Sequence, residues 1–169
     1  PFCISDRLMF KLESTERNSV PVYGVHTGGC DKLEREKLIQ AALEARTHSY
    51  SPYSHFQVGA ALLTKEGKIY QGCNIENAAY TPSVCAERNA FFKAVYEGER
   101  NFAAIAIAGS PEGPCKAYAA PCGVCRQVMM EFCDPKEFCI ITAKSTEEYR
   151  EYSLEELLPM GFGPKDLEG

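Results

Sequence analysis

The chain has 169 residues, of which 45% are hydrophobic and 24% charged, the size and composition of a single globular domain. Its 18 basic and 23 acidic residues give a net charge of −5, and no cluster of Lys and Arg occurs along it, which argues against a polynucleotide partner. No segment approaches the roughly 18 apolar residues of a membrane span, and the first residues lack an apolar signal core. We therefore expect a cytoplasmic protein without a membrane partner.

The predicted elements begin after residues 1–30, which show no sustained periodicity and end in a pair of glycines. We expect these residues to form an N-terminal extension and residues 31–169 to form one domain. In chain order the domain is predicted to contain a helix over 33–48, strands over 57–64 and 68–75, a helix over 84–96, a strand over 102–108, a helix over 122–132, strands over 138–142 and 148–152, and a short helix from 153.

Local signals connect these elements into one sheet. Lys65-Glu66-Gly67 is a hairpin signal between the first two strands, and the continuous apolar run 102–108 is typical of a strand covered on both faces. Pro121 is expected at the start of the helix over 122–132, where its missing N–H does no harm. The link 143–147 is too short for a crossover helix, so the last two strands should be antiparallel. The prediction is a three-layer α/β/α sandwich on a mixed five-stranded sheet.

The chemistry is concentrated in two short cysteine motifs, Cys85-Ala86-Glu87-Arg88 and Pro121-Cys122-Gly123-Val124-Cys125. Cys122 and Cys125 are three residues apart, which places both sulfurs on one side of a helical turn. Cys85 can supply a third ligand. Three protein ligands with a fourth position open to water are typical of a catalytic zinc site, whereas four protein ligands are typical of a structural one. Because both motifs begin helices, the helix N-termini should favour thiolates.

Glu87 is expected to be catalytic instead of a fourth ligand. It follows Cys85 by two residues, about 200° around a helix at roughly 100° per residue, so the two side chains diverge. A carboxyl group in a buried site has its pKa raised toward neutrality, which suits it to accept and donate protons. Without the flanking cysteines, a solvated Glu in a first helical turn would be the ordinary interpretation.

These motifs resemble those of the cytidine deaminases, in the small, homotetrameric, nucleoside-acting branch of the zinc deaminases. The resemblance runs from about Lys32 to the C-terminus. It is carried, in order, by SPYSHF at 51–56, VGAAL at 58–62, GCNIENAAY at 72–80, CAER at 85–88, PCGVCRQV at 121–128, and LLP at 157–159 followed by Phe162-Gly163. The chain departs from the pattern at Asn89, where the family more often has Thr, in residues 1–30, and in a long Pro- and Gly-containing connector over 109–120.

The resemblance implies a zinc-dependent hydrolytic deamination of cytidine and 2′-deoxycytidine in pyrimidine salvage, with one Zn²⁺ per subunit held by Cys85, Cys122 and Cys125. Arg88 would hydrogen-bond the ligand sulfurs; its alternative is a surface salt bridge. The implied substrate-binding residues are Phe56, Asn74, Glu76, Ala78, Tyr80, Ala86 and Phe162. Asn74 and Glu76 would bind the ribose, and Glu76 would repel a phosphate, which favours free nucleosides. Tyr80, Ala78 and Phe162 would reach a neighbouring subunit's site in a homotetramer.

Several alternatives remain open on the sequence. Phe56 could equally be a core aromatic. Cys73 or another thiol could complete a four-cysteine cage, which would make the zinc structural. Cys122 and Cys125 could form a dithiol redox pair, although this leaves Cys85 and Glu87 unexplained. Within the enzymes, a deaminase of modified nucleosides such as blasticidin S is the alternative.

His26, His48 and His55 are interpreted as non-ligands. The nine cysteines do not indicate a disulfide framework, and Cys73, Cys133 and Cys139 are expected to be buried.

Overall fold

The computed structural model describes residues 31–167, so the predicted N-terminal extension and His26 lie outside the described residues. The elements are α1 (Lys32–Arg46), β1 (Gln57–Thr64), β2 (Ile69–Cys73), α2 (Ala86–Tyr96), β3 (Phe102–Ser110), α3 (Gly123–Phe132), β4 (Cys139–Ala143), β5 (Tyr149–Ser153), α4 (Leu154–Leu157) and a 3₁₀ turn (Pro164–Leu167). In this part of the chain no helix is both long and apolar enough to cross a bilayer.

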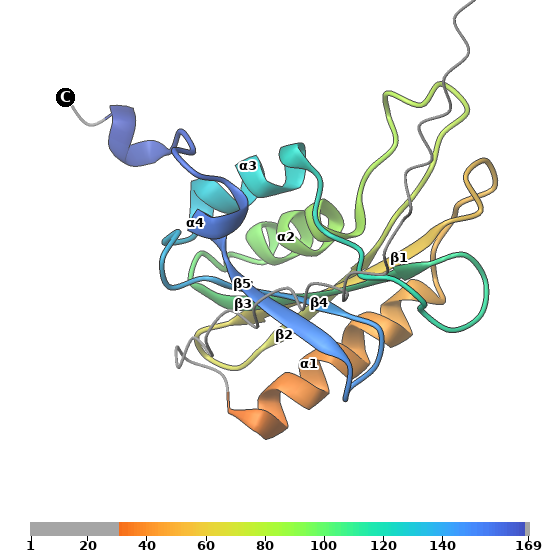
Figure 1. Cartoon of the computed structure of the whole chain (residues 1–169). Coiled ribbons are helices and arrows are strands. Elements are labelled where there is room, and N and C mark those ends of the chain that lie inside the picture. The colour runs from red at the N-terminus through yellow and green to blue at the C-terminus, as the bar shows by residue number, and fades with distance from the viewer. Residues whose placement is uncertain (1–30, 168–169) are drawn as a thin grey trace, which may run out of the picture.

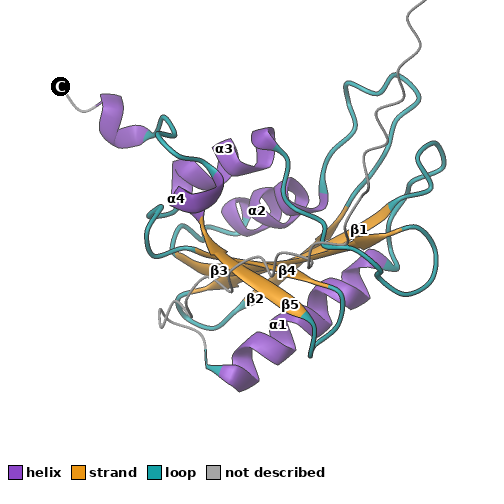
Figure 2. Cartoon of the chain, viewed as in Figure 1, coloured by secondary structure: helices purple, strands orange, loops and turns teal. Residues whose placement is uncertain are grey.

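The five strands form one mixed sheet in the order β2-β1-β3-β4-β5. Only β3 and β4 are parallel, with α3 on the crossover between them, and the other neighbours are antiparallel. Helix α1 covers one face of the sheet, and α2, α3 and α4 lie on the other (Figure 1). Figure 2 shows the same layers by secondary structure. The predicted three-layer sandwich and the antiparallel last pair are confirmed.

The alternation of side chains along β3 divides the core into two layers. Ile105 and Ile107 pack toward α2 and α3, whereas Ala104, Ala106 and Ala108 pack toward α1. The small residues on the second face allow α1 to come close to the sheet. A Cβ added at Gly59 would lie 2.1 Å from the Ala42 carbonyl oxygen, so β1 and α1 are in backbone contact there.

Both motif helices begin later than predicted. Cys85 and Cys122 have extended backbone conformations and are the N-caps of α2 and α3, so the helices begin at Ala86 and Gly123. Pro121 directly precedes the N-cap of α3, so the helix begins one residue later than the predicted Cys122. Strand β2 is also shorter than expected. Asn74 still donates to the Val58 carbonyl of β1 at 3.1 Å, but Ile75 forms isolated bridges to Tyr50 and Val84. The short helix predicted from 153 is present as α4, and a capping box of Ser153 and Glu156 begins it.

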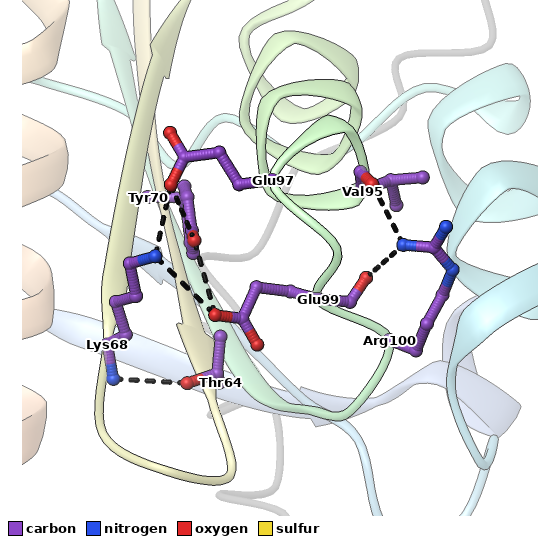
Figure 3. A network of polar contacts seen from close by, with 7 residues as sticks. All are labelled: Thr64, Lys68, Tyr70, Val95, Glu97, Glu99 and Arg100. Atoms are coloured by element: carbon purple, nitrogen blue, oxygen red, sulfur yellow. Dashed lines mark hydrogen bonds and ion pairs between the residues drawn. The ribbon is translucent and has the colours of Figure 1, made fainter.

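A polar network holds the C-terminal end of α2 against the β1–β2 hairpin (Figure 3). The Lys68 ammonium group lies 3.0 Å from a Glu97 carboxylate oxygen and 3.5 Å from one of Glu99. The Tyr70 hydroxyl donates to the same two carboxylates, at 3.0 and 3.3 Å. The opposite end of α2 carries the first cysteine motif, so this network helps fix the helix that presents it.

Candidate metal centre and substrate pocket

Three cysteine sulfurs from two helix N-termini converge at one point. Cys85 Sγ lies 3.8 Å from Cys122 Sγ, which lies 3.5 Å from Cys125 Sγ, and all three sulfurs lie within 4.8 Å of one another. Tetrahedral zinc with Zn–S bonds of about 2.3 Å places ligand sulfurs roughly 3.8 Å apart, so the cluster matches the geometry that zinc requires. The side chains of the two N-cap residues, Cys85 and Cys122, make no capping hydrogen bond to the helix backbone. Both sulfurs are therefore available as ligands.

Hydrogen-bond donors around Cys85 favour its thiolate. The Cys125 thiol, and after it the Arg88 guanidinium and the Cys122 thiol, lower the pKa of Cys85 to about 5 against the opposing effect of burial. Cys125 donates to Cys85 and is itself buried, so its own pKa is raised. Coordination to a cation deprotonates a thiol outright, so a bound metal ion would favour the thiolate of Cys125 despite its raised pKa.

Glu87 lies beside this cluster and is almost completely buried, with 4% of its surface exposed. Burial, assisted by the negative charge of Cys85, raises its pKa to about 7. A carboxyl group with that pKa is protonated and deprotonated in comparable amounts at neutral pH, as proton transfer in both directions requires. The cluster of potential ligands among the described residues comprises only the three cysteines.

Arg88 points its guanidinium back at the cluster. Its Nη2 donates to Cys85 Sγ at 3.8 Å and to the Ser83 carbonyl at 3.2 Å. No ion pair of Arg88 occurs among residues 31–167, so the salt-bridge alternative finds no support there. A cation that donates to a ligand sulfur offsets part of the negative charge of three thiolates.

A pocket of about 370 Å³ opens beside the cluster. Its lining consists of Phe56, Val58, Asn74, Cys85, Ala86, Glu87, Ile107, Ala119, Ala120 and Cys122. Glu87 and two of the three cysteines thus share a hollow with an aromatic ring and an amide. Larger hollows of about 590 and 680 Å³ occur around Asp134, but neither contains a predicted site residue.

Phe56 and Asn74 are held together at this pocket. The Asn74 amide nitrogen donates to the Phe56 carbonyl at 2.9 Å, and its Oδ1 accepts from the Val58 N–H at 2.8 Å and from the Ser49 hydroxyl at 2.6 Å. These bonds leave one N–H of Asn74 for a substrate. Phe56 is 38% exposed and lines the pocket, which argues against the core-aromatic alternative.

Glu76 does not line the pocket, but it is bonded to the loop that leads to Phe56. Its Oε2 accepts from the backbone N–H groups of Tyr53 and Ser54, at 3.0 and 3.2 Å. Contacts to Ser54, first from its side chain, lower the pKa of Glu76, so the group is a carboxylate at neutral pH. The structure therefore presents a fixed negative charge near the pocket.

Three predicted substrate-binding residues lie on the surface of the single subunit instead of in the pocket lining. Ala78, Tyr80 and Phe162 are exposed or partly exposed, with Tyr80 at 72% and Phe162 at 58%. The Tyr80 ring lies 6.0 Å from that of Tyr53. The Phe162 carbonyl accepts a hydrogen bond from Gln127 Nε2 at 2.8 Å, which ties the C-terminal segment to α3.

The sequence reasoning missed four lining residues: Val58, Ile107, Ala119 and Ala120. Val58 and Ile107 belong to predicted strands, and the two alanines directly precede Pro121. The remaining cysteines also differ from expectation: Cys73, Cys133 and Cys139 are partly buried and not fully buried, because they lie at the ends of their elements. Cys73 donates to the His48 carbonyl at 3.2 Å and takes no part in the cluster, which argues against the four-cysteine cage.

Comparison with known proteins identifies the family. Residues 32–142 match the model of the cytidine and deoxycytidylate deaminase zinc-binding region. The chain belongs to this family. It is 47% identical over 135 residues to a cytidine deaminase of Sporosarcina psychrophila and 44% identical over 135 residues to one of Halalkalibacterium halodurans; these alignments cover 80% of this chain and 96% and 98% of the relatives.

Solved structures agree with this assignment. A cytidine deaminase from Burkholderia pseudomallei is 47% identical, covers 75% of this chain and 97% of its own, and has a TM-score of 0.67. The enzyme from Mycobacterium tuberculosis is 35% identical, covers 75% and 95%, and has a TM-score of 0.64. The chain is therefore an enzyme of the hydrolytic deaminase class with the cytidine deaminase fold.

Proposed function

We propose that this cytidine deaminase family member converts cytidine and 2′-deoxycytidine, with water, to uridine and 2′-deoxyuridine plus ammonia, as a step of pyrimidine salvage in the cytoplasm. The observation that carries the proposal is the buried Glu87 with a pKa of about 7, in one pocket with Cys85 and Cys122. The relatives' name supplies the substrate class. Free thiols at the seven described cysteines suit a reducing compartment.

Cys85, Cys122 and Cys125 would hold the zinc ion, one per subunit. When bound, zinc supplies Lewis acidity and lowers the pKa of water from ~15.7 to about 7, so that a nucleophile is available at neutral pH. Only three sulfurs approach the site among the described residues, as the open position of a catalytic centre requires.

Glu87 would move the protons. Replacing the amino group at C4 of cytosine by oxygen requires a proton to leave water, one to reach N3 and one to reach the departing nitrogen. As a carboxylate, Glu87 accepts the first proton and, as an acid, donates it to N3. It then accepts the second proton of the former water, from the hydroxyl group now on C4, and donates it to the amino group, which leaves as ammonia. Its position among buried groups excludes bulk water from competing for these transfers.

The pocket walls would orient the nucleoside. The Phe56 ring would pack on the base, and the backbone of Ala86, at the start of α2, would allow the base to approach closely. Asn74, through its remaining N–H, and Glu76 would bind the ribose hydroxyls. The fixed charge of Glu76 would repel a phosphate, which supports a free nucleoside as substrate and agrees with the net charge of −5.

A homotetramer with composite active sites would complete this pocket. Ala78, Tyr80 and Phe162 would then contribute to neighbouring subunits' sites. The support is that Tyr80 and Phe162 expose large apolar surface in the single subunit, and that Gln127 fixes the backbone at Phe162. Residues 31–169 would be the deaminase domain and residues 1–30 an extension, since the relatives match almost their whole length to 80% of this chain.

The test is to purify the protein, measure its zinc content and follow the fall in ultraviolet absorbance as cytidine becomes uridine. Turnover of cytidine and deoxycytidine with about one zinc per chain is the expected result. Deamination of blasticidin S but not of cytidine would favour the alternative enzyme, and thiol–disulfide exchange that survives chelation would favour the redox alternative.

A further inference from the structure

Residues 111–121, which join β3 to Cys122, the N-cap of α3, form part of the wall of the pocket. We call this segment the β3–α3 connector; in Figure 1 it loops out beside the C-terminal end of α1. Ala119 and Ala120, near its end, line the pocket together with Glu87. Ala119 packs where Gly109 leaves room: a Cβ added at Gly109 would lie 2.8 Å from that of Ala119 and 3.0 Å from the Phe56 ring.

Arg46, the last residue of α1, binds the first half of the connector. Its Nη2 donates to the Gly113 carbonyl at 2.6 Å, and its Nη1 donates to Cys115 Sγ at 3.2 Å and to the hydroxyl of Ser110. Ser110 is 96% buried and donates onward to the Pro111 carbonyl at 2.7 Å. A planar guanidinium can make several such bonds at once in a fixed geometry, which a lysine cannot.

Tyr118 binds the second half to the β4–β5 hairpin. Lys144 Nζ lies 4.6 Å and Arg150 Cζ 4.2 Å from the centroid of its ring. The Tyr118 hydroxyl also donates to Glu148 at 3.4 Å. Both cations lie within the distance at which a cation is attracted to an aromatic ring. Tyr118 directly precedes Ala119, so its position determines where the pocket wall begins.

Other connector side chains contribute little to holding it in place. Pro111, Glu112, Lys116 and Ala117 are exposed, and neither charged residue among them has a hydrogen bond or ion pair within the described residues. A segment of this length loses much conformational entropy when it is ordered, and only specific contacts offset that loss. The contacts of Arg46 and Tyr118 come from opposite ends of the domain's sequence, from α1 and from the β4–β5 hairpin.

We infer that Arg46 and Tyr118 are positioning residues, which hold the β3–α3 connector so that Ala119 and Ala120 form a wall of the substrate pocket. The inference rests on the proposed function for its substrate. It implies that loss of either residue impairs substrate binding and orientation without removing a metal ligand or Glu87. Misplacement of such a wall by about 1 Å can lower catalytic efficiency by up to roughly a hundredfold.

The test uses the zinc-loaded full chain with four variants. Arg46→Ala removes the first set of bonds, and Tyr118→Leu removes the ring. Tyr118→Phe keeps the ring and loses only the hydroxyl. Lys116→Ala changes an exposed connector residue that has no hydrogen bond or ion pair within residues 31–167; these two are the controls. Each variant is measured for zinc content, steady-state kinetics on cytidine and hydrogen exchange of the amides in residues 111–121.

We expect Arg46→Ala and Tyr118→Leu to raise the KM and lower kcat/KM by about ten- to a hundredfold, with normal zinc content and faster exchange in the connector. Lys116→Ala should match the parent. Tyr118→Phe, which loses only the long hydroxyl contact with Glu148, should show a much smaller effect than Tyr118→Leu. The inference is overturned if Tyr118→Leu has the same kcat/KM as Tyr118→Phe. It is also overturned if the amides of residues 111–121 exchange no faster in Arg46→Ala and Tyr118→Leu than in the parent. If the parent itself fails to deaminate cytidine, the proposed function fails, while hydrogen exchange still decides whether the two residues hold the connector.

Discussion

Gly72 of β2 packs directly on the carbonyl of Ala86, the first residue of α2: a Cβ added at Gly72 would lie 2.4 Å from that oxygen and 2.5 Å from the Ala90 nitrogen. Both contacts are with backbone, which cannot rotate away. Because Cys85 and Glu87 lie at this same end of α2, the missing side chain at Gly72 allows the proposed metal ligand and proton-transfer group to lie close to the sheet.

Gly72→Ala should therefore destabilise the protein by about 1–3 kcal/mol, the usual cost of overpacking, as measured by the denaturant midpoint. Gly123→Ala is the matched control, since a Cβ there meets nothing within 4 Å and Ala favours a helix. Equal stability of the two variants would show that α2 does not pack this tightly on β2.

Glu87→Gln should preserve fold and zinc content but lower kcat by at least about a hundredfold, because the amide keeps the shape of the side chain and cannot transfer protons. Zinc analysis and turnover on the same preparation provide the measurement. Turnover close to that of the parent would falsify the proton-transfer role and favour a structural zinc.

Cys122→Ala should lose both zinc and activity, because two sulfurs hold zinc much more weakly than three. Cys133→Ala is the control: Cys133 lies at the opposite end of α3 and outside the three-sulfur cluster. Exhaustive chelation of the parent should abolish turnover, and zinc should restore it. Retention of full activity after the metal has been removed would exclude the zinc mechanism.

The sequence predicted the layers and the sheet because hydrophobic periodicity and short links restrict the topology strongly. It placed the helix starts one and two residues too early, at Cys122 and Val84, since a cap residue differs from a first helical residue only in its backbone angles. It predicted Cys85, Cys122 and Cys125 from motif and spacing. It could not predict Ala119 or the partners of Arg46, because these depend on which distant segments the fold brings into contact.

Asn74 illustrates the same limit at a single residue. The motif resemblance implies that its side-chain amide binds the ribose. In the structure, that amide already donates to the Phe56 carbonyl and accepts from the Val58 N–H and the Ser49 hydroxyl. Motif matching gives the position of a polar group but not how many of its hydrogen bonds remain available. Glu76, which accepts through one carboxylate oxygen, is therefore the better test of sugar binding.

Glu76→Ala should lower kcat/KM for cytidine by roughly ten- to a hundredfold, the loss expected for a hydrogen bond to a charged group. The loss on 2′,3′-dideoxycytidine should be much smaller, because that substrate already lacks the hydroxyls and the second deletion removes nothing further. Equal losses on both substrates would mean that Glu76 acts only on the Tyr53–Ser54 backbone, to which it is bonded.

Phe162 is expected to act on a neighbouring subunit. Its ring is exposed while its carbonyl is bonded to Gln127, so the backbone is fixed and the side chain is available. Phe162→Ala should raise the KM for cytidine by about tenfold or more, the effect of losing a buried aromatic contact in a pocket, and leave zinc content unchanged. Leu167→Ala, which truncates another exposed apolar residue of the same segment, should have little effect.

Mixing two inactive or impaired variants tests whether the ring acts between subunits. Phe162→Ala chains have an intact metal centre and no ring, and Cys122→Ala chains have the ring and no competent metal centre. In hybrids, an intact centre on one chain receives an intact ring from another, so a fraction of sites should recover the KM of the parent. Native mass spectrometry establishes that hybrids have formed. If hybrids form and show only the kinetics of the two separate variants, the ring acts within its own chain and the composite-site proposal is wrong. Exchange of chains cannot restore a pocket that each chain completes by itself.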